Sequence, residues 1–306
     1  MATKSVHQSV EPDRIALNAR DVEFDFHELP LHWIPNEPVA THMINVMHMM
    51  LPEFEEWFVR CFSEALPYIK DEQLKEDVLG FIGQEAQHAK GHADALERLK
   101  AQGLDPGPFA EQMAWLVKLL YSNRGLSGRA RYELMVLQAS LTSAIEHITA
   151  FLGQWVLNAK SLDAAGADPV MLDLLRWHGA EEVEHRSVAY DLYQHLDGGY
   201  VRRVVPYGLV LPALVWVWII VGTRYLLKND PVVQGNASLD PLTFWRASRK
   251  GILPTVWEIV KMAPGYLMPK YHPSKYGSTS QAVAYLANSP AARSAIDRQY
   301  LQASAR

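Results

Sequence analysis

The sequence is almost free of cysteine and has no block of positively charged residues. It has a single cysteine, Cys61, among 306 residues, and 29 Lys and Arg against 34 Asp and Glu. One cysteine excludes an internal disulfide, a thiolate zinc site and a cysteine-ligated iron–sulfur cluster within this chain. Nucleic acid is not expected as a partner, because binding it requires clustered Lys and Arg. Any bound metal must therefore be held by imidazole and carboxylate groups, which suit iron, manganese or zinc.

Signals for export and for a nucleotide cofactor are also missing. The first residues lack the apolar core of a signal peptide, so we expect a cytoplasmic protein. No Gly-x-Gly-x-x-Gly motif is present, so redox chemistry by this chain requires electrons from an external electron donor protein.

One long run lacks charge altogether. Residues 204–223 contain no charged side chain and are bracketed by basic residues. As a helix, this run is long enough to cross a bilayer. Pro206 and Pro212 weaken its helical character, whereas Trp216 and Trp218 are typical of a membrane-embedded or interfacial segment. We expect this run to meet lipid at the cytoplasmic face of the membrane, a second subunit in a homodimer, or the rest of the protein.

Helical periodicity dominates the remaining chain. Residues 1–40 predict an irregular arm interrupted by prolines, although alternation at 22–26 is typical of a short strand. Helices are predicted at 42–66, 71–102, 109–121, 127–158 and 168–197, followed by a tail of short helices broken at Pro254, Pro264, Pro269 and Pro273. We expect an all-α fold with an arm (1–40), a metal-binding helix bundle (41–198) and an apolar helical extension with a tail (199–306).

Two helices carry the same pair of potential metal ligands. Glu85 and His88 lie three residues apart on the apolar side of one helix, and Glu182 and His185 repeat this spacing on another. A buried carboxylate without a partner costs several kcal/mol unless it is protonated or paired, and a buried cation removes that cost. A di-iron type of site needs one such pair from each of two helices and a single Glu from each of two others.

The two additional glutamates follow from periodicity. Glu55 shares a helix face with large apolar residues, whereas Glu56 falls on the solvent side. Glu146 lies in the run 134–157, which contains no other charged residue. The face around Glu146 has small side chains, which leaves room for a substrate or permits close packing of helices.

This pattern resembles a known class of metal proteins. Glu55, Glu85, His88, Glu146, Glu182 and His185, in this order, are similar to the ligand set of the ferritin-like di-iron carboxylate proteins. The resemblance implies a ferritin-like four-helix bundle that holds two iron ions, with manganese or zinc as alternatives. The chain as a whole, including its apolar run and the sequence Tyr271-His272-Pro273, also resembles a bacterial family labelled predicted metal-dependent hydrolases.

His178 extends the resemblance. It precedes Glu182 by four residues and His185 by seven, a spacing similar to that of the p-aminobenzoate N-oxygenase group, which implies a third histidine ligand. A role behind the ligands or in the core is the alternative for His178. Glu181 also lies within helical reach and remains an alternative to Glu182, which we prefer because it repeats the first pair. The roles of His92, His147 and His272 stay open, although His92 is placed to support a ligand.

Three functions fit these residues. The leading hypothesis is a dinuclear iron enzyme that activates dioxygen to oxidise or oxygenate an apolar small molecule, supplied with electrons by a separate protein. The alternative is a dinuclear metal-dependent hydrolase. A third possibility is iron handling without catalysis, which leaves the C-terminal third of the chain without a role.

Overall fold

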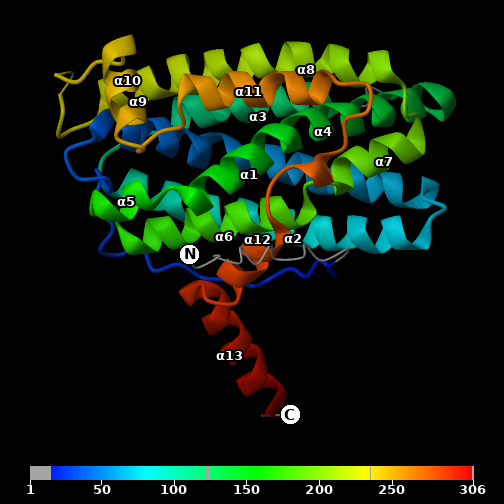
Figure 1. Ribbon diagram of the computed structural model, residues 1–306, viewed down its shortest axis with the longest axis horizontal. Coiled ribbons are helices and arrows are strands. Elements are labelled where there is room, and N and C mark those ends of the chain that lie inside the picture. The colour runs from blue at the N-terminus through cyan, green and yellow to red at the C-terminus, as the bar shows by residue number, and fades with distance from the viewer. Residues whose placement is uncertain (1–14, 122–124, 235, 305–306) are drawn as a thin grey trace, which may run out of the picture.

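The computed structural model describes residues 15–121, 125–234 and 236–304 and shows a helical protein (Figure 1). The elements in chain order are α1 (Pro38–Ala65), η1 (Leu66–Tyr68), α2 (Glu72–Ala101), α3 (Gly107–Tyr121), α4 (Gly128–Asn158), α5 (Lys160–Ala164), α6 (Pro169–His185), α7 (Val188–Leu196), α8 (Tyr200–Leu214), η2 (Val215–Gly222), α9 (Thr223–Asn229), α10 (Pro241–Arg249), α11 (Val256–Leu267), η3 (Pro273–Lys275), α12 (Thr279–Leu286) and α13 (Pro290–Ser304). The described residues contain no strand, which confirms the predicted all-α class. Segment 22–26 is irregular, because a strand needs a paired neighbour and none is present in these residues.

Aspartate side chains cap the start of two long helices, and one predicted helix is divided. Asp71 and Asp168 each accept hydrogen bonds from two backbone N–H groups at the start of α2 and α6. The single helix expected over 168–197 is wrong, because the structure separates it into α6 and α7. Buried Arg186 lies at the break, and its guanidinium donates a hydrogen bond to the backbone oxygen of Val183. This side chain takes the place of the next backbone N–H, so the last turn of α6 is closed there.

Four long helices form the body of the molecule. Helix α1 packs along α2, helix α4 packs along α6, and the two pairs meet through contacts of α1 with α4 and of α2 with α6. Buried apolar residues fill the space between them, with Trp33 and Trp177 in one cluster and Trp57 and Phe81 in another. Acidic and histidine side chains from all four helices are buried inside this bundle.

The apolar run is more helical than its prolines suggested. Helix α8, the π-helical η2 and α9 form one continuous helix, Tyr200–Asn229, with Pro206 and Pro212 inside it. By length and composition this is the one helix among the described residues that is apolar enough to cross a membrane. Only 11% of its most apolar window is buried, so the run is not a core helix. It lies lengthwise on the bundle, where α8 contacts α4, and η2 and α9 contact α1 (Figure 1).

Short helices complete the chain. Helix α10 contacts α1, α11 contacts α4, and α12 and α13 contact α6. The expectation that Pro264 breaks a helix is wrong, because it lies inside α11. One turn of α11 continues past this proline, where buried Tyr266 donates a hydrogen bond to the hydroxyl of Ser143 on α4 at 3.0 Å. Packing against the bundle therefore holds the end of α11 in helical form.

Candidate metal centre

The structure brings together all seven residues that the sequence singled out. Their ligand atoms form two groups, each with atoms within 4.8 Å of one another: Glu55, His88 and His178 in the first, and Glu85, Glu146, Glu182 and His185 in the second. Helix α1 supplies one of these residues, α2 two, α4 one and α6 three. Every member is buried, with an exposed fraction of at most 4%.

Two glutamates connect the groups. Glu182 lies 2.8 Å from Nε2 of His178 through one carboxylate oxygen, and 3.5 Å from Nε2 of His185 through the other. Glu85 Oε1 lies 3.2 Å from Nε2 of His185 and 3.7 Å from Nδ1 of His88. Glu55 lies 3.7 Å from Nε2 of His178 in the first group. Two carboxylates thus occupy the middle of the cluster, and the others lie to its sides.

Unsatisfied polar atoms gather at this point. Both carboxylate oxygens of Glu55, Glu85 and Glu146 are buried without a hydrogen-bond partner among the described residues. The same holds for Nδ1 of His88 and Nε2 of His185. Buried polar groups are nearly always paired, because leaving one unpaired costs about 1–3 kcal/mol. These unpaired carboxylate and imidazole atoms are suitable ligands for a pair of divalent cations. The four positive charges of two such cations would balance the four glutamates.

Each of the three histidines is held at the nitrogen that faces away from the cluster. Nε2 of His88 donates to Glu181 at 3.0 Å, and Nδ1 of His185 donates to the amide oxygen of Gln84 at 3.0 Å. Nδ1 of His178 pairs with Nε2 of His92 at 2.6 Å. A hydrogen bond at the far nitrogen fixes ring orientation, and for His88 and His185 it also fixes the tautomer.

Glu181 and Glu182 face different surroundings, and the geometry favours Glu182 as the candidate ligand. Glu182 faces the cluster, whereas Glu181 lies behind His88 and is bound on its other oxygen by Arg20 at 2.6 Å. Arg20 also pairs with Glu184 at 2.9 Å, and Gln84 donates to the same carboxylate at 3.0 Å. Sequence analysis missed Arg20, because the irregular arm has no periodicity that points to a face.

A line of histidines continues from the cluster to α1. His92 lies between His178 and His48, with its Nδ1 2.8 Å from Nδ1 of His48. Burial lowers the pKa of His48 to about 3 and holds the pKa of His92 well below its ordinary value, so both rings are neutral. His92 thus has the supporting position that the sequence suggested. His48 was missed, although it lies seven residues before Glu55 on the same face of α1.

Burial and mutual repulsion raise the pKa values of most carboxyl groups in the cluster, as expected for crowded acids. Burial, with the neighbouring carboxylates, raises the pKa of Glu55 well above its usual range and that of Glu146 to about 8. Burial is also the main cause that raises the pKa of Glu85 to about 8. Glu182 is the exception: burial would raise its pKa, but the charge of His185 and hydrogen bonds from His178 and His185 hold it well below the usual value. A cation can replace the protons on these acids.

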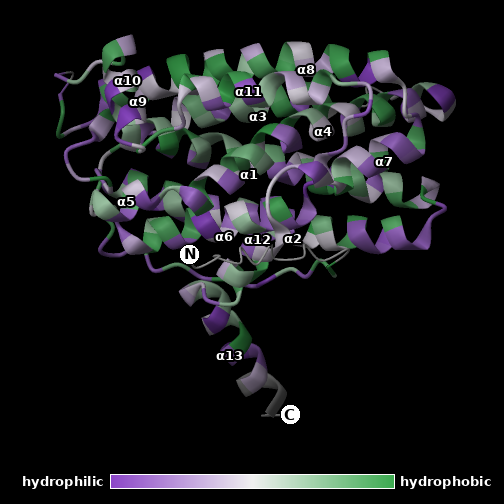
Figure 2. Ribbon diagram, in the orientation of Figure 1, coloured by the Kyte–Doolittle hydropathy of each residue, from purple (hydrophilic) through white to green (hydrophobic). Residues whose placement is uncertain are grey.

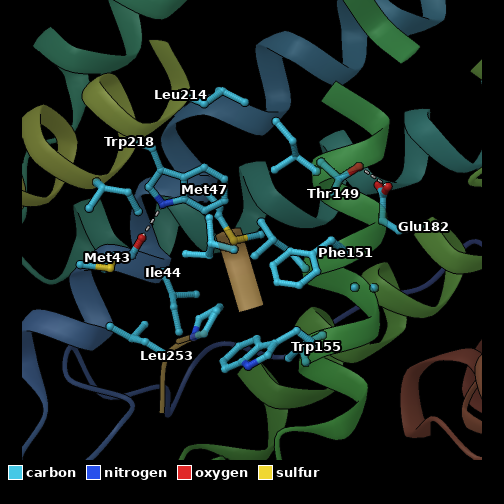
Figure 3. A pocket seen from close by; sticks show the side chains of 18 of the residues that line it. Met43, Ile44, Met47, Thr149, Phe151, Trp155, Glu182, Leu214, Trp218 and Leu253 are labelled. Carbon is cyan, nitrogen blue, oxygen red and sulfur yellow. Dashed lines mark hydrogen bonds between the residues drawn. The ribbon is translucent and has the colours of Figure 1, made fainter. Parts of the chain in front are cut away.

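An apolar cavity of about 160 Å³ adjoins the cluster (Figure 3). Aliphatic and aromatic side chains from α1, α4, α6, α8, η2, α10 and α11 line most of it, including Trp155 and Trp218. The other polar side chains in its lining are Thr149, His178 and Glu182. Thr149 donates a hydrogen bond to Glu182 at 2.5 Å, as Figure 3 shows. The small residues near Glu146 serve both expected purposes. Thr149 and Gly153 line the cavity, and the backbones of Gly153 and Gly179 touch where α4 crosses α6.

The other histidines lie elsewhere. His147 points away from Glu146 and pairs with the hydroxyl of Tyr271 at 2.8 Å, and His272 pairs with Asp191 at 3.0 Å. A separate cluster joins His32 and His42 to one carboxylate oxygen of Asp230 at 2.6 and 2.7 Å, while the other oxygen accepts two backbone N–H groups. These hydrogen bonds satisfy Asp230 fully, and they fasten the end of α9 to α1 and the arm.

Comparison with known proteins identifies a family and no individual relative. Neither a search of curated proteins nor a search of solved structures finds a match to this chain. The ferritin-like fold and the likeness to p-aminobenzoate N-oxygenase therefore stay predictions. A family model described as "Predicted metal-dependent hydrolase" matches residues 18–277, which include the second half of the arm, every residue of the cluster and the apolar helix. The chain belongs to this family of predicted metal-dependent hydrolases.

Proposed function

We propose that the protein is a dinuclear iron enzyme that uses dioxygen to oxidise an apolar small molecule. Glu55, His88 and His178 would hold one ion, and Glu146 and His185 would hold the other. Glu85 and Glu182 lie within reach of both groups. Manganese or zinc suits the same donors, so the identity of the metal is part of the proposal.

The observation that carries the proposal is the apolar cavity at His178 and Glu182. Two bound iron ions would supply redox chemistry with dioxygen, and the lining of the cavity would determine which substrates can reach them. An ester, amide or phosphate needs hydrogen-bond donors around its polar group. Apart from the cluster residues, the side chains that line the cavity offer the Thr149 hydroxyl, which is bound to Glu182, and the indole N–H groups of Trp155 and Trp218, the second of which is bound to Met43. A substrate rich in C–H bonds needs no such donors. The cavity therefore favours oxidation of an apolar group over cleavage of a polar one.

The chain's own residues perform three tasks around this reaction. Thr149 orients Glu182 through its hydrogen bond, and the aliphatic lining excludes water from the cluster. Gln84, Glu181 and His92 hold the imidazoles in place. The sequence contains no Gly-x-Gly-x-x-Gly nucleotide-binding motif, so the proposed oxidation would take its electrons from a separate protein.

Hydrolysis is the second candidate, and the family description supports it directly. Iron handling without catalysis is the third, but an apolar cavity beside the cluster is not a route for hydrated cations. The two enzymatic candidates use the same ligands and differ in metal and co-substrate.

One experiment separates the candidates. Protein purified without oxygen is analysed for metal, then given a chemical reductant and oxygen, and its oxygen uptake is compared with its cleavage of p-nitrophenyl esters. Two irons per chain and oxygen uptake that Glu182→Gln abolishes support oxidation. Ester cleavage that depends on Glu182, without oxygen uptake, assigns hydrolysis instead. Wild-type protein that binds fewer than two metals refutes the dinuclear centre.

A further inference from the structure

We propose that the face formed by α8, η2, α10 and α11 docks on the surface of an anionic lipid bilayer, so that the cavity opens toward the leaflet and takes up a lipid-soluble substrate from it. The docking stands on surface residues alone, whereas the uptake of substrate rests on the proposed function.

The continuous helix presents a long apolar stripe to the outside. Val201, Val205, Leu209 and Trp216 lie on this stripe with exposed fractions of 65%, 54%, 70% and 62%. No charged side chain occurs between Arg203 and Arg224. Figure 2 shows α8 and α11 as mostly green and pale ribbons on the same side of the molecule. Contiguous apolar surface of this length on a soluble protein marks an interaction site.

Two short helices add tryptophans that are paired with cations. Trp245 of α10 and Trp257 of α11 are half-exposed or more, at 51% and 64%. The Arg249 guanidinium lies 4.7 Å from the ring centre of Trp245, and Nζ of Lys261 lies 5.2 Å from that of Trp257. Aromatic rings beside basic groups are typical of the boundary between lipid tails and headgroups.

The charge of this region is opposite to that of the whole chain. Residues 200–268 contain eight Lys and Arg against three Asp and Glu, whereas the complete sequence contains 29 against 34. One of the three acids, Glu258, is engaged in the capping box of α11 with Thr255. Of the eight basic residues, Arg203 is buried, and Arg202 and Lys250 pair with acids outside this region. The five others are exposed on α9, α10 and α11: Arg224, Lys228, Arg246, Arg249 and Lys261. Anionic headgroups attract a basic residue near the surface by about 1 kcal/mol. This charge favours an anionic bilayer over a second copy of the same basic face.

The helix lies along the bilayer instead of crossing it. Its inner side is covered by α4 and α1 from α8 through α9, and that side buries Arg203, Tyr207 and Leu226 against the bundle. A full crossing would carry the adjoining bundle helices, with their charged surfaces, into the hydrocarbon. Partial insertion of the outer stripe avoids this cost.

The cavity and the face share their helices. Val215 lines the cavity and is 45% exposed, so the wall of the cavity reaches the outer surface at η2. Ile259 and Met262 of α11 and Phe244 of α10 also line the cavity. An engineered cavity of about 150 Å³ binds benzene. The cavity here therefore accepts a ring or the end of an alkyl chain, the kind of group that dissolves in a leaflet.

Vesicle flotation tests the docking without any enzyme assay. Purified metal-loaded protein is mixed with vesicles of phosphatidylcholine, with or without 30% phosphatidylglycerol by composition, at low and high salt. We expect flotation with the anionic vesicles, weakened by salt, and at least tenfold weaker partitioning for Leu209→Glu combined with Trp257→Glu. Leu79→Glu is the matched control, because Leu79 is 51% exposed on α2, outside this face. The control should float like wild type, and all variants should keep their metal content.

The outcomes distinguish this proposal from the proposed function. No flotation of a wild-type protein that retains two metals refutes docking and leaves the metal centre intact. Equal flotation with both vesicle types, independent of salt, refutes the anionic surface. A dimer in solution that Leu209→Glu dissociates, without flotation, assigns the face to a second copy. Flotation by a protein that lacks metal-dependent activity supports docking and counts against the proposed reaction alone.

Discussion

The closest approach of α4 and α6 gives a quantitative test of how the bundle positions its metal centre. A Cβ added at Gly153 would lie 2.4 Å from the backbone oxygen of Gly179 and 2.9 Å from its Cα. Ordinary contact begins at 3.4 Å, so Gly153→Ala requires the two helices to separate by about 1 Å. Glu146 on α4 and Glu182 on α6 would separate with them. Neither neighbour is a flexible side chain, so the strain cannot be relieved locally.

The expected magnitude is the difference between two opposing terms. Alanine in a helix interior is favoured over glycine by about 0.5–1 kcal/mol. Overpacking costs about 1–3 kcal/mol and falls at the upper end where backbone meets backbone. We therefore expect Gly153→Ala to lower the free energy of unfolding by about 1–2 kcal/mol. Gly208→Ala is the matched control: nothing lies within 4 Å of an added Cβ there, so it should raise stability by about 0.5–1 kcal/mol.

Guanidinium unfolding and metal titration measure the two consequences. The midpoint should fall for Gly153→Ala and rise slightly for Gly208→Ala, with unchanged slopes. Metal–ligand distances tolerate only about 0.2 Å, so Gly153→Ala should also weaken metal binding at least tenfold in competition with a chromophoric chelator. A Gly153→Ala protein that is stabilised like Gly208→Ala and binds metal normally would show that the contact does not position the ligands.

Two further pairs of substitutions test the ligand assignment. Glu146→Ala should lose at least one metal and all activity while keeping its helical circular dichroism. Glu133→Ala is the control on the same helix, because the Glu133 carboxylate pairs with Arg202 outside the site, and it should keep both metals. Two metals bound to Glu146→Ala at wild-type affinity would contradict the assignment. Glu182→Gln should lose metal. Glu181→Gln removes the negative charge that supports His88 and pairs with Arg20, and it should bind both metals about 10–100-fold more weakly. Loss of metal from Glu181→Gln alone, measured by metal analysis, would reverse the two roles.

Periodicity within single helices was sufficient to find the inward acids. Glu55 and Glu56 are neighbours in the sequence, yet the first is 1% exposed and the second faces solvent, as the apolar positions around them predicted. The same local argument placed Glu85 and Glu182 inside. Such predictions need only the 3.6-residue repeat of one helix, because a continuous apolar stripe has one side that can be buried.

Contacts between distant segments could not be predicted from the periodicity of single helices. Arg20 in the irregular arm reaches Glu181 across 161 positions of sequence, and no local pattern marks either partner. The break at Arg186 also depends on tertiary contacts, since its guanidinium bonds Thr279 of α12 as well as α6. The apolar extension was predicted to be helical but weakened at Pro206 and Pro212, and its continuity through both prolines has a related cause. Packing on α4 and α1 compensates for the hydrogen bonds that the prolines remove.

The supporting contacts explain how a bundle can bury this many acids and remain ready for metal. The histidines are oriented by Gln84, Glu181 and His92, and Arg20 neutralises the acids behind His88, so these constraints exist before any cation arrives. The surrounding core is large and apolar, so we expect folding not to depend on metal as it does in a small zinc domain. Metal then adds stability by binding the folded state alone, and the carboxyl groups release the protons that burial had retained. Because Glu182 and His178 face both the cluster and the cavity, the residues that would hold metal also form the end of the cavity where an apolar substrate would meet it.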